Sequence, residues 1–142
     1  MAAPPKQTPV PPDILAKLQL SCLDLPEAYE ETAWVGTRWM VAKKNFAHVL
    51  MIEGGYPPAY AKVAKVAKSR GAVCVLTFRT PGPAAEFPRF RNPPFFLPGW
   101  WPDIAGMILD EHTDWYEVAT LLTRSYRALA PRKLADLVED PD

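Results

Sequence analysis

The chain has 142 residues, of which 49% are hydrophobic and 23% charged, and its 16 lysines and arginines balance 16 acids. This length fits one globular domain, and the composition excludes disordered, collagen-like and low-complexity chains. Two cysteines, Cys22 and Cys74, are too few for a disulfide framework or a zinc knuckle. No apolar run reaches the ~20 residues that span a bilayer, and the N-terminus lacks the apolar core of a signal peptide. We therefore expect a cytoplasmic protein with reduced thiols.

The first half of the chain predicts one helix followed by three strands. Residues 1–11 form an expected flexible, proline-rich lead-in. Apolar residues at helical spacing predict a helix over 13–23, with Asp13 as its N-cap. Runs of β-formers predict strands over 28–35, 39–42 and 46–52. Because short turns separate these runs, the strands should form an antiparallel meander.

The second half predicts further strands and a long helix. Residues 59–69 form either a short surface helix or a loop, and residues 73–78 form a central strand that is apolar on both faces. Two more extended segments are expected at 95–97 and 104–109. A helix follows over 114–130, with Asp114 and Glu117 as a capping box and with a buried stripe made of Trp115, Val118, Ala119, Leu122, Tyr126 and Leu129. A short helix over 133–138 precedes a frayed acidic tail, 139–142.

The predicted strands follow one another in the middle of the chain, and the predicted helices lie at its two ends. This order predicts an α+β fold in two layers. We expect a single antiparallel sheet of about five strands, with the N-terminal and C-terminal helices packed on one face. The order is helix, three strands, a helical crossover, two strands and helix. One domain should cover residues 12–138.

The zero net charge hides an uneven distribution along the chain. Residues 38–91 carry ten lysines and arginines against two acids, whereas residues 1–37 and 92–142 are both acidic. A block with eight excess positive charges suggests a face for an anionic partner. The alternative is that the fold brings residues 24–31 or the acids of the C-terminal helix over the block and neutralises it.

Nucleic acid is the anionic partner that this block favours. Lys62, Lys65 and Lys68 recur every third residue, which on a helix would present a row of phosphate ligands, and Lys43-Lys44 would sit at a hairpin tip. The candidate contacts are Arg38, Lys43, Lys44, Lys62, Lys65, Lys68, Arg70, Arg79, Arg89 and Arg91. We expect the lysines and Arg70 to share one continuous surface. An ordinary solvated face is the alternative for each group.

Tryptophans offer a second candidate site. Trp34, Trp39, Trp100 and Trp101 could line an aromatic pocket for a small molecule or stack on bases, although aromatic residues in strands more often belong to the core. Catalysis has little support, because His48 and His112 lack spaced partners and no nucleotide-binding, hydrolase or metalloprotease motif is present. We expect no catalytic residues, no metal site and no cofactor.

Several stretches of the sequence match one family, in the same order along the chain. They are residues 22–27 with the acids at 30–31, then 34–39, 46–50, 75–79, 94–96 and 114–134. In order and spacing they resemble the MmcQ/YjbR-like proteins over roughly residues 12–137. The resemblance implies a two-layer α+β fold of the CyaY-like or secretion-chaperone-like kind and a DNA-binding role, and it carries over no catalytic residues. Other members have a basic stretch where this chain reads Leu97-Pro98-Gly99-Trp100-Trp101, so that loop has lost its charges.

These observations lead to three functional hypotheses. The first is a small, monomeric, non-catalytic protein that binds double-stranded DNA through phosphate and shape contacts. The second is a protein-binding, chaperone-like adaptor that uses the sheet face and exposed aromatic residues. The third is an enzyme or a small-molecule binder with the aromatic pocket.

Overall fold

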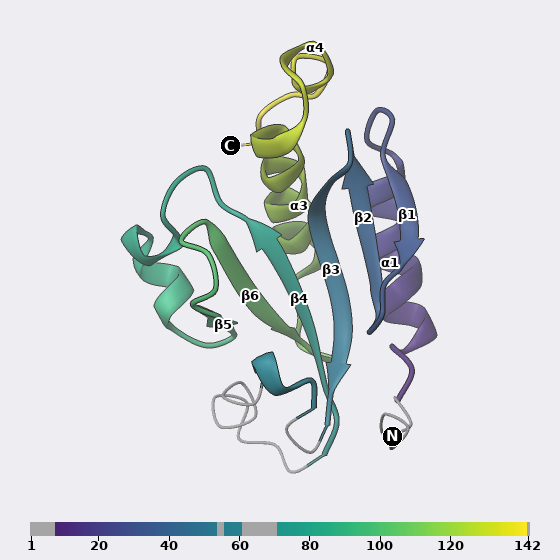
Figure 1. Cartoon of the computed structure of the whole chain (residues 1–142), viewed down its shortest axis with the longest axis vertical. Coiled ribbons are helices and arrows are strands. Elements are labelled where there is room, and N and C mark those ends of the chain that lie inside the picture. The colour runs from purple at the N-terminus through teal and green to yellow at the C-terminus, as the bar shows by residue number, and fades with distance from the viewer. Residues whose placement is uncertain (1–7, 54–55, 61–70, 142) are drawn as a thin grey trace.

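The computed structural model describes residues 8–53, 56–60 and 71–141 (Figure 1). Within these ranges the helices are α1 (Pro12–Leu23), α3 (Trp115–Leu129) and α4 (Arg132–Ala135), with short 3-10 helices η1 (Pro58–Tyr60), η2 (Ala84–Glu86) and η3 (Pro88–Arg91). The strands are β1 (Tyr29–Thr32), β2 (Thr37–Val41), β3 (Lys44–Ile52), β4 (Val73–Arg79), β5 (Phe95–Phe96) and β6 (Ile104–Leu109). None of the helices there is long and apolar enough to cross a membrane.

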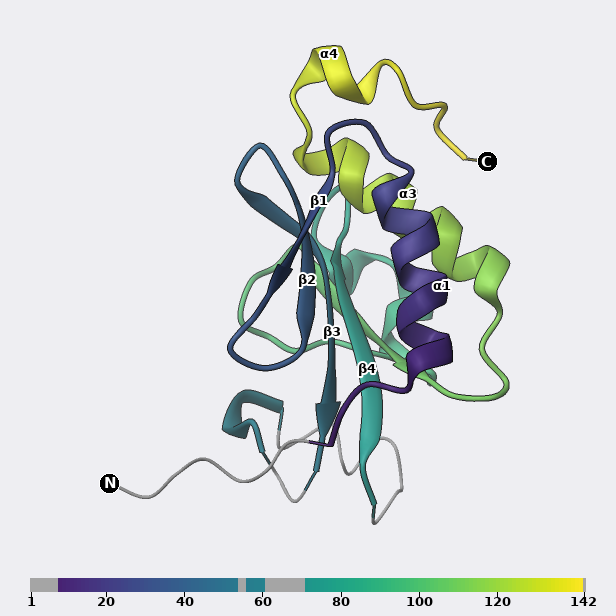
Figure 2. The same cartoon turned by 90° about the vertical axis from the view of Figure 1, so that its right-hand side faces the viewer.

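The strands form one antiparallel sheet in the order β1-β2-β3-β4-β6-β5. Helices α1 and α3 cover the same face of this sheet, which gives two layers (Figure 2). The α+β class and the single antiparallel sheet are therefore confirmed. The sheet has six strands rather than about five, because the two-residue strand β5 adds to the edge of β6.

Alternation along the strands separates two apolar faces. On the helix side, the sheet residues Trp39, Phe46, Val49, Leu76 and Met107 pack against α1 and α3. These helices contribute Ile14, Leu18, Cys22, Val118, Leu121, Leu122 and Tyr126. Successive side chains of a strand point to opposite faces of the sheet, so the intervening residues form a second apolar face. The main core therefore lies between the helices and the sheet.

The second, smaller core lies on the open face, away from the helices. Leu50, Ile52, Val73 and Val75 meet Tyr60 of η1 there, together with Val35 and Phe96. Phe96 pairs with Gly106 across the β5–β6 ladder, and a Cβ at Gly106 would lie 2.2 Å from its ring. The glycine inside this strand therefore leaves room for an aromatic ring close to the sheet.

Helix α3 is tied to the sheet by one buried hydroxyl. Ser125 donates to the carbonyl oxygen of Phe46 at 2.5 Å and accepts from the backbone N–H of Arg79 at 2.8 Å. These two residues lie one step beyond the last β3–β4 pair, Ala47 with Phe78. Ser125 therefore links β3, β4 and α3 at the end of the ladder. No buried side-chain nitrogen or oxygen in the described residues lacks a hydrogen-bond partner.

At the ends of the chain, one expectation is wrong and two contacts hold the terminal segments. Asp13 lies in the first turn of α1, but the N-cap position is Pro11 and no side chain caps the helix. The described part of the acidic tail contacts α3, where Arg124 Nη2 donates to the carbonyl oxygen of Pro141 at 2.6 Å. Part of the lead-in is also held, since Val10 packs on the main core and the Thr8 hydroxyl donates to Glu53.

Candidate functional site

The structure neutralises part of the predicted basic block. Arg38 Nη2 lies 2.8 Å from Glu31 Oε1, opposite it in the β1–β2 ladder, and Arg79 Nη1 lies 2.9 Å from Asp103. Arg89 pairs with Glu117 of α3 at 3.6 Å. Glu31 belongs to residues 24–31 and Glu117 to the C-terminal helix, the two segments that were expected to neutralise the block if it were not displayed. Arg38 and Arg89 are therefore neutralised in this way.

Lys43 and Lys44 remain available. Lys43 lies in the turn between β2 and β3, where Ala42 and Lys43 adopt the left-handed conformation with φ of 48° and 65°, and Lys44 is the first residue of β3. Both lysines are exposed, and no acid of the described residues forms an ion pair with either. Arg91 is also exposed, but its Nε donates to the carbonyl oxygen of Ala85 at 2.9 Å.

The lysine row and Arg70 lie outside the described residues, so the structure does not place them on any surface. The strand ends nearest to that segment, Ile52 and Val73, pair with each other at the far end of β3 from Lys44. Lys44 and Ile52 are eight positions apart on β3, which corresponds to about 26 Å.

The four tryptophans do not form one pocket. Trp39 is fully buried on the helix side, where its indole N–H donates to Glu30 Oε1 at 3.0 Å. Trp100 packs edge-on against Tyr60 on the open face, with 4.7 Å between ring centroids. The sheet itself therefore separates Trp39 from Trp100. Trp34 and Trp101 are 82% and 62% exposed, so neither belongs to the core.

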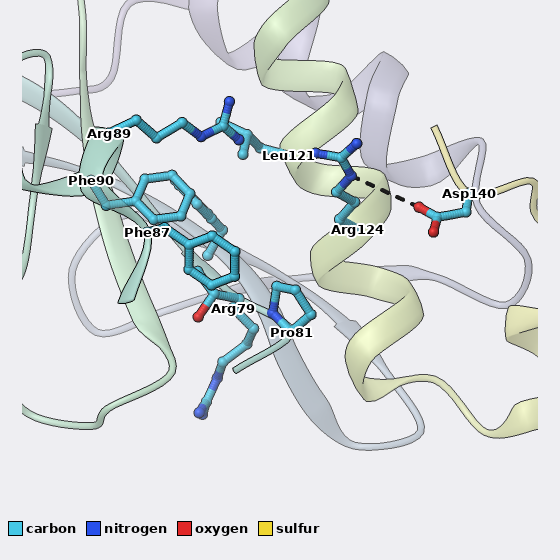
Figure 3. Close-up of a pocket in the computed structure, with 10 residues that line it drawn as sticks. Arg79, Pro81, Phe87, Arg89, Phe90, Leu121, Arg124 and Asp140 are labelled. Carbon is cyan, nitrogen blue, oxygen red and sulfur yellow. Dashed lines mark ion pairs between the residues drawn. The ribbon is translucent and has the colours of Figure 1, made fainter. Parts of the chain in front are cut away.

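A pocket of about 350 Å³ lies between the end of β4, the segment of η2 and η3, and helix α3 (Figure 3). Its apolar lining consists of Phe78, Pro81, Phe87, Phe90 and Leu121. Arg89 and Arg124 reach toward each other at its rim, whereas the guanidinium of Arg79 points away from both (Figure 3). We call this site the arginine pocket.

Sequence reasoning missed the arginine pocket as a unit. It selected Arg79 and Arg89 for a different surface and did not consider Arg124. The spacing of α3 contained the missing signal, because Leu121 and Arg124 are three residues apart and so lie on one side of the helix. Leu121 is buried although the predicted stripe did not include it.

The two histidines have different surroundings in the structure. His48 Nε2 donates to the carbonyl oxygen of Val35 at 2.6 Å, and burial lowers the pKa of this histidine, with a smaller contribution from Arg38. His112 lies on the surface beside Glu111. In the described part of the chain, no three His, Cys, Asp or Glu side chains are grouped so that they could hold a metal ion.

Cys22 and Cys74 are buried, free thiols. Burial raises the pKa of Cys74 to about 12 and also raises the pKa of Cys22, so both remain protonated at neutral pH. We expect neither thiol of the native protein to react with Ellman's reagent within minutes. After denaturation in guanidinium without reductant, two thiols should react per chain. Fewer than two would indicate a disulfide or another oxidised form.

Comparison with known proteins identifies the family. No curated protein and no solved structure matches the chain. A sequence model of the YjbR family matches residues 23–128, which run from the last residue of α1 to the last turn of α3. The match covers more than half of the chain and includes all six strands. The chain therefore belongs to the YjbR family.

Proposed function

We propose that this YjbR-family protein is a monomeric, non-catalytic, cytoplasmic protein that binds the phosphate backbone of duplex DNA without a cofactor. The β2–β3 turn is the observation that carries the proposal. Lys43 in this turn and Lys44 directly after it are exposed and have no ion pair among the described residues. Cations that the fold leaves uncompensated are the ones that can release counterions from a phosphate backbone.

One neighbouring cation, Arg79, supports this function from the same end of the sheet. Arg79 ends β4, and its neighbour Phe78 pairs with Ala47, three residues beyond Lys44 on β3. Lys44 and Arg79 therefore lie at the same end of the β3–β4 ladder, within about 10 Å along the strands. A small cavity there is lined by both Asn45 and Arg79. Arg79 could thus also bind a phosphate at the turn if it exchanged its ion pair with Asp103 for one with the phosphate.

Changing Lys43 and Lys44 together to Gln should weaken DNA binding about equally for unrelated sequences. For every phosphate that the variant no longer neutralises, the slope of log K against log salt concentration should become shallower by about 0.9. Fluorescence anisotropy with a labelled 20-base-pair duplex, titrated at several salt concentrations, measures both quantities. Stability should change by no more than about 0.5 kcal/mol, because both side chains are exposed.

Lys17→Gln is the matched control. Lys17 lies on α1, where its ammonium is 5.0 Å from the ring centroid of Trp115, on the helix side of the sheet. The Lys17→Gln variant should leave the slope of log K against log salt concentration unchanged. The triple change of Lys62, Lys65 and Lys68 to Gln tests the lysine row in the same assay. If the wild-type protein does not bind at low salt, or if its slope is near zero, the DNA proposal is wrong.

A protein-binding adaptor is the second candidate, and one observation favours it. Trp34 and Trp101 are strongly exposed, and Trp34 packs on Tyr56 at 6.3 Å between ring centroids. Tyr56 in turn packs on the open-face core. Exposed aromatic residues that continue from a core are typical of interaction surfaces. Absence of DNA binding would make this the leading function.

A further inference from the structure

The arginine pocket combines an apolar floor with two guanidinium groups that are only loosely paired. Phe90 lies in its floor and packs against Phe78 and Phe87, with 5.7 Å between ring centroids in both cases. Phe87 is half-buried, so part of its ring is open to the pocket. The volume of about 350 Å³ falls at the lower end of the range for small-molecule sites. An inorganic anion would leave most of this space unfilled.

Both rim arginines form only long ion pairs with carboxylates of the chain. Arg124 Nε lies 3.8 Å from Asp140 Oδ1, and Arg89 Nη1 lies 3.6 Å from Glu117 Oε2. Charge-assisted hydrogen bonds between guanidinium and carboxylate measure about 2.7–2.9 Å, so neither pair forms one. The pair between Arg79 and Asp103, at 2.9 Å, does reach that distance. Arg89 can therefore accept an external acid without losing a strong bond. Arg124 keeps a strong bond from Nη2 to the carbonyl oxygen of Pro141, at 2.6 Å, and can offer its other N–H donors to an acid.

The position of Arg89 is itself fixed by aromatic rings. Its guanidinium carbon lies 4.9 Å from the ring centroid of Phe90 and 5.8 Å from that of Phe95. Stacking of this kind orders a guanidinium while leaving its N–H donors free for a ligand. On the other side of the pocket, Arg124 leaves one turn of α3 beside the anchored Ser125.

From this geometry we propose that the arginine pocket binds a small aromatic carboxylate. The carboxylate lies between Arg89 and Arg124, and the flat ring rests on Phe87, Phe90 and Pro81. Asp140 of the C-terminal tail pairs with Arg124 when no ligand is bound, and it competes with the carboxylate of the ligand for this guanidinium. The proposal rests on residues other than Lys43 and Lys44, so it stands or falls separately from DNA binding.

The first experiment uses the wild-type protein and three probes: 2-naphthoate, its neutral analogue 2-naphthylmethanol, and inorganic phosphate. Amide chemical shifts in ¹H–¹⁵N NMR spectra report where each probe binds. We expect 2-naphthoate to shift amides of residues 79–90 and 121–124. The neutral analogue should bind at least about tenfold more weakly, since it lacks the charged hydrogen bonds. Equal binding of the neutral analogue, shifts confined to other residues, or phosphate binding as tight as 2-naphthoate would each overturn the proposal.

Variants then test the individual residues. Arg89→Gln and Arg124→Gln should each weaken 2-naphthoate binding about tenfold or more. Asp140→Asn should strengthen it, by up to about fivefold, because the competing exposed ion pair is weak. Arg132→Gln is the matched control, since the Arg132 side chain is 95% exposed on α4 and should not affect binding. An equal loss with Arg132→Gln, or weaker binding with Asp140→Asn, would contradict the assigned site.

Discussion

Replacing Leu122 with alanine is expected to lower the free energy of unfolding by about 2–5 kcal/mol. Leu122 lies in the middle of α3 and is fully buried in the main core between the helices and the sheet. Truncation removes apolar packing and leaves a cavity that the helix and the sheet cannot fully close. Urea unfolding followed by circular dichroism measures the change as a shift of the midpoint at constant slope.

Leu20→Ala is the control for this prediction, because it makes the same chemical change on the surface. Leu20 is on α1 and is 76% exposed. We expect its free energy of unfolding to stay within about 0.5 kcal/mol of wild type. Similar midpoint shifts for both variants would mean that the side of α3 that faces the sheet is wrongly assigned.

Replacing Gly36 with alanine should also destabilise the protein by about 2–5 kcal/mol. Gly36 lies between β1 and β2 with a φ of +77°, where an L-residue costs about 1–2 kcal/mol. In addition, an added Cβ would lie 2.0 Å from the carbonyl oxygen of Val49. Val49 belongs to the central strand β3 and cannot move away without disturbing its pairing with Thr37 and Leu76. Overpacking of this kind adds about 1–3 kcal/mol.

Gly99 separates the two causes of that destabilisation. Its φ is +86°, but a Cβ there would meet no atom within 4 Å. Gly99→Ala should therefore cost only the backbone term, about 1–2 kcal/mol. Thermal or urea unfolding of both variants gives the comparison. If Gly36→Ala lost no more stability than Gly99→Ala, the close approach to Val49 would have no energetic effect.

The elements of the fold could be predicted where local signals were strong. Residues 104–109 form β6 as expected, and Asp114 caps α3 by accepting from the backbone N–H groups of Tyr116 and Glu117. These features depend on alternation and on capping chemistry, which involve neighbouring residues only. Strand β5 was harder to place as a strand, because its two residues pair with Gly106 and Met107 and have no periodicity of their own.

The expected strand over 28–35 ends earlier, at Thr32, for a reason that involves distant residues. Trp34 has high strand propensity but lies in the turn, where it is exposed beside Tyr56. The turn is set by Gly36 and its close contact with β3, which sequence spacing does not show. Propensity was thus overridden by tertiary packing.

The candidate sites show the same division between local and long-range information. A polar pair between two strands predicts the hairpin tip at Lys43-Lys44, and the structure has its turn at Ala42 and Lys43, with Lys44 beginning β3. The pairing of Arg89 with Glu117 and of Arg124 with Asp140 depends on how η3 and the tail lie against α3. Segment charges could not reveal which cations would be neutralised, because the partners come from different parts of the chain.

The bonds that α3 makes to early residues determine when the chain can fold during synthesis. The Tyr126 hydroxyl donates to the carbonyl oxygen of Pro26, 100 residues earlier, and Ser125 reaches Phe46 across 79 residues. Until α3 has left the ribosome, the helix side of the sheet, including Phe46 and Leu76, has only α1 to cover it. Most of the nascent chain must therefore wait with an uncovered apolar surface, which is the kind of segment that chaperones hold.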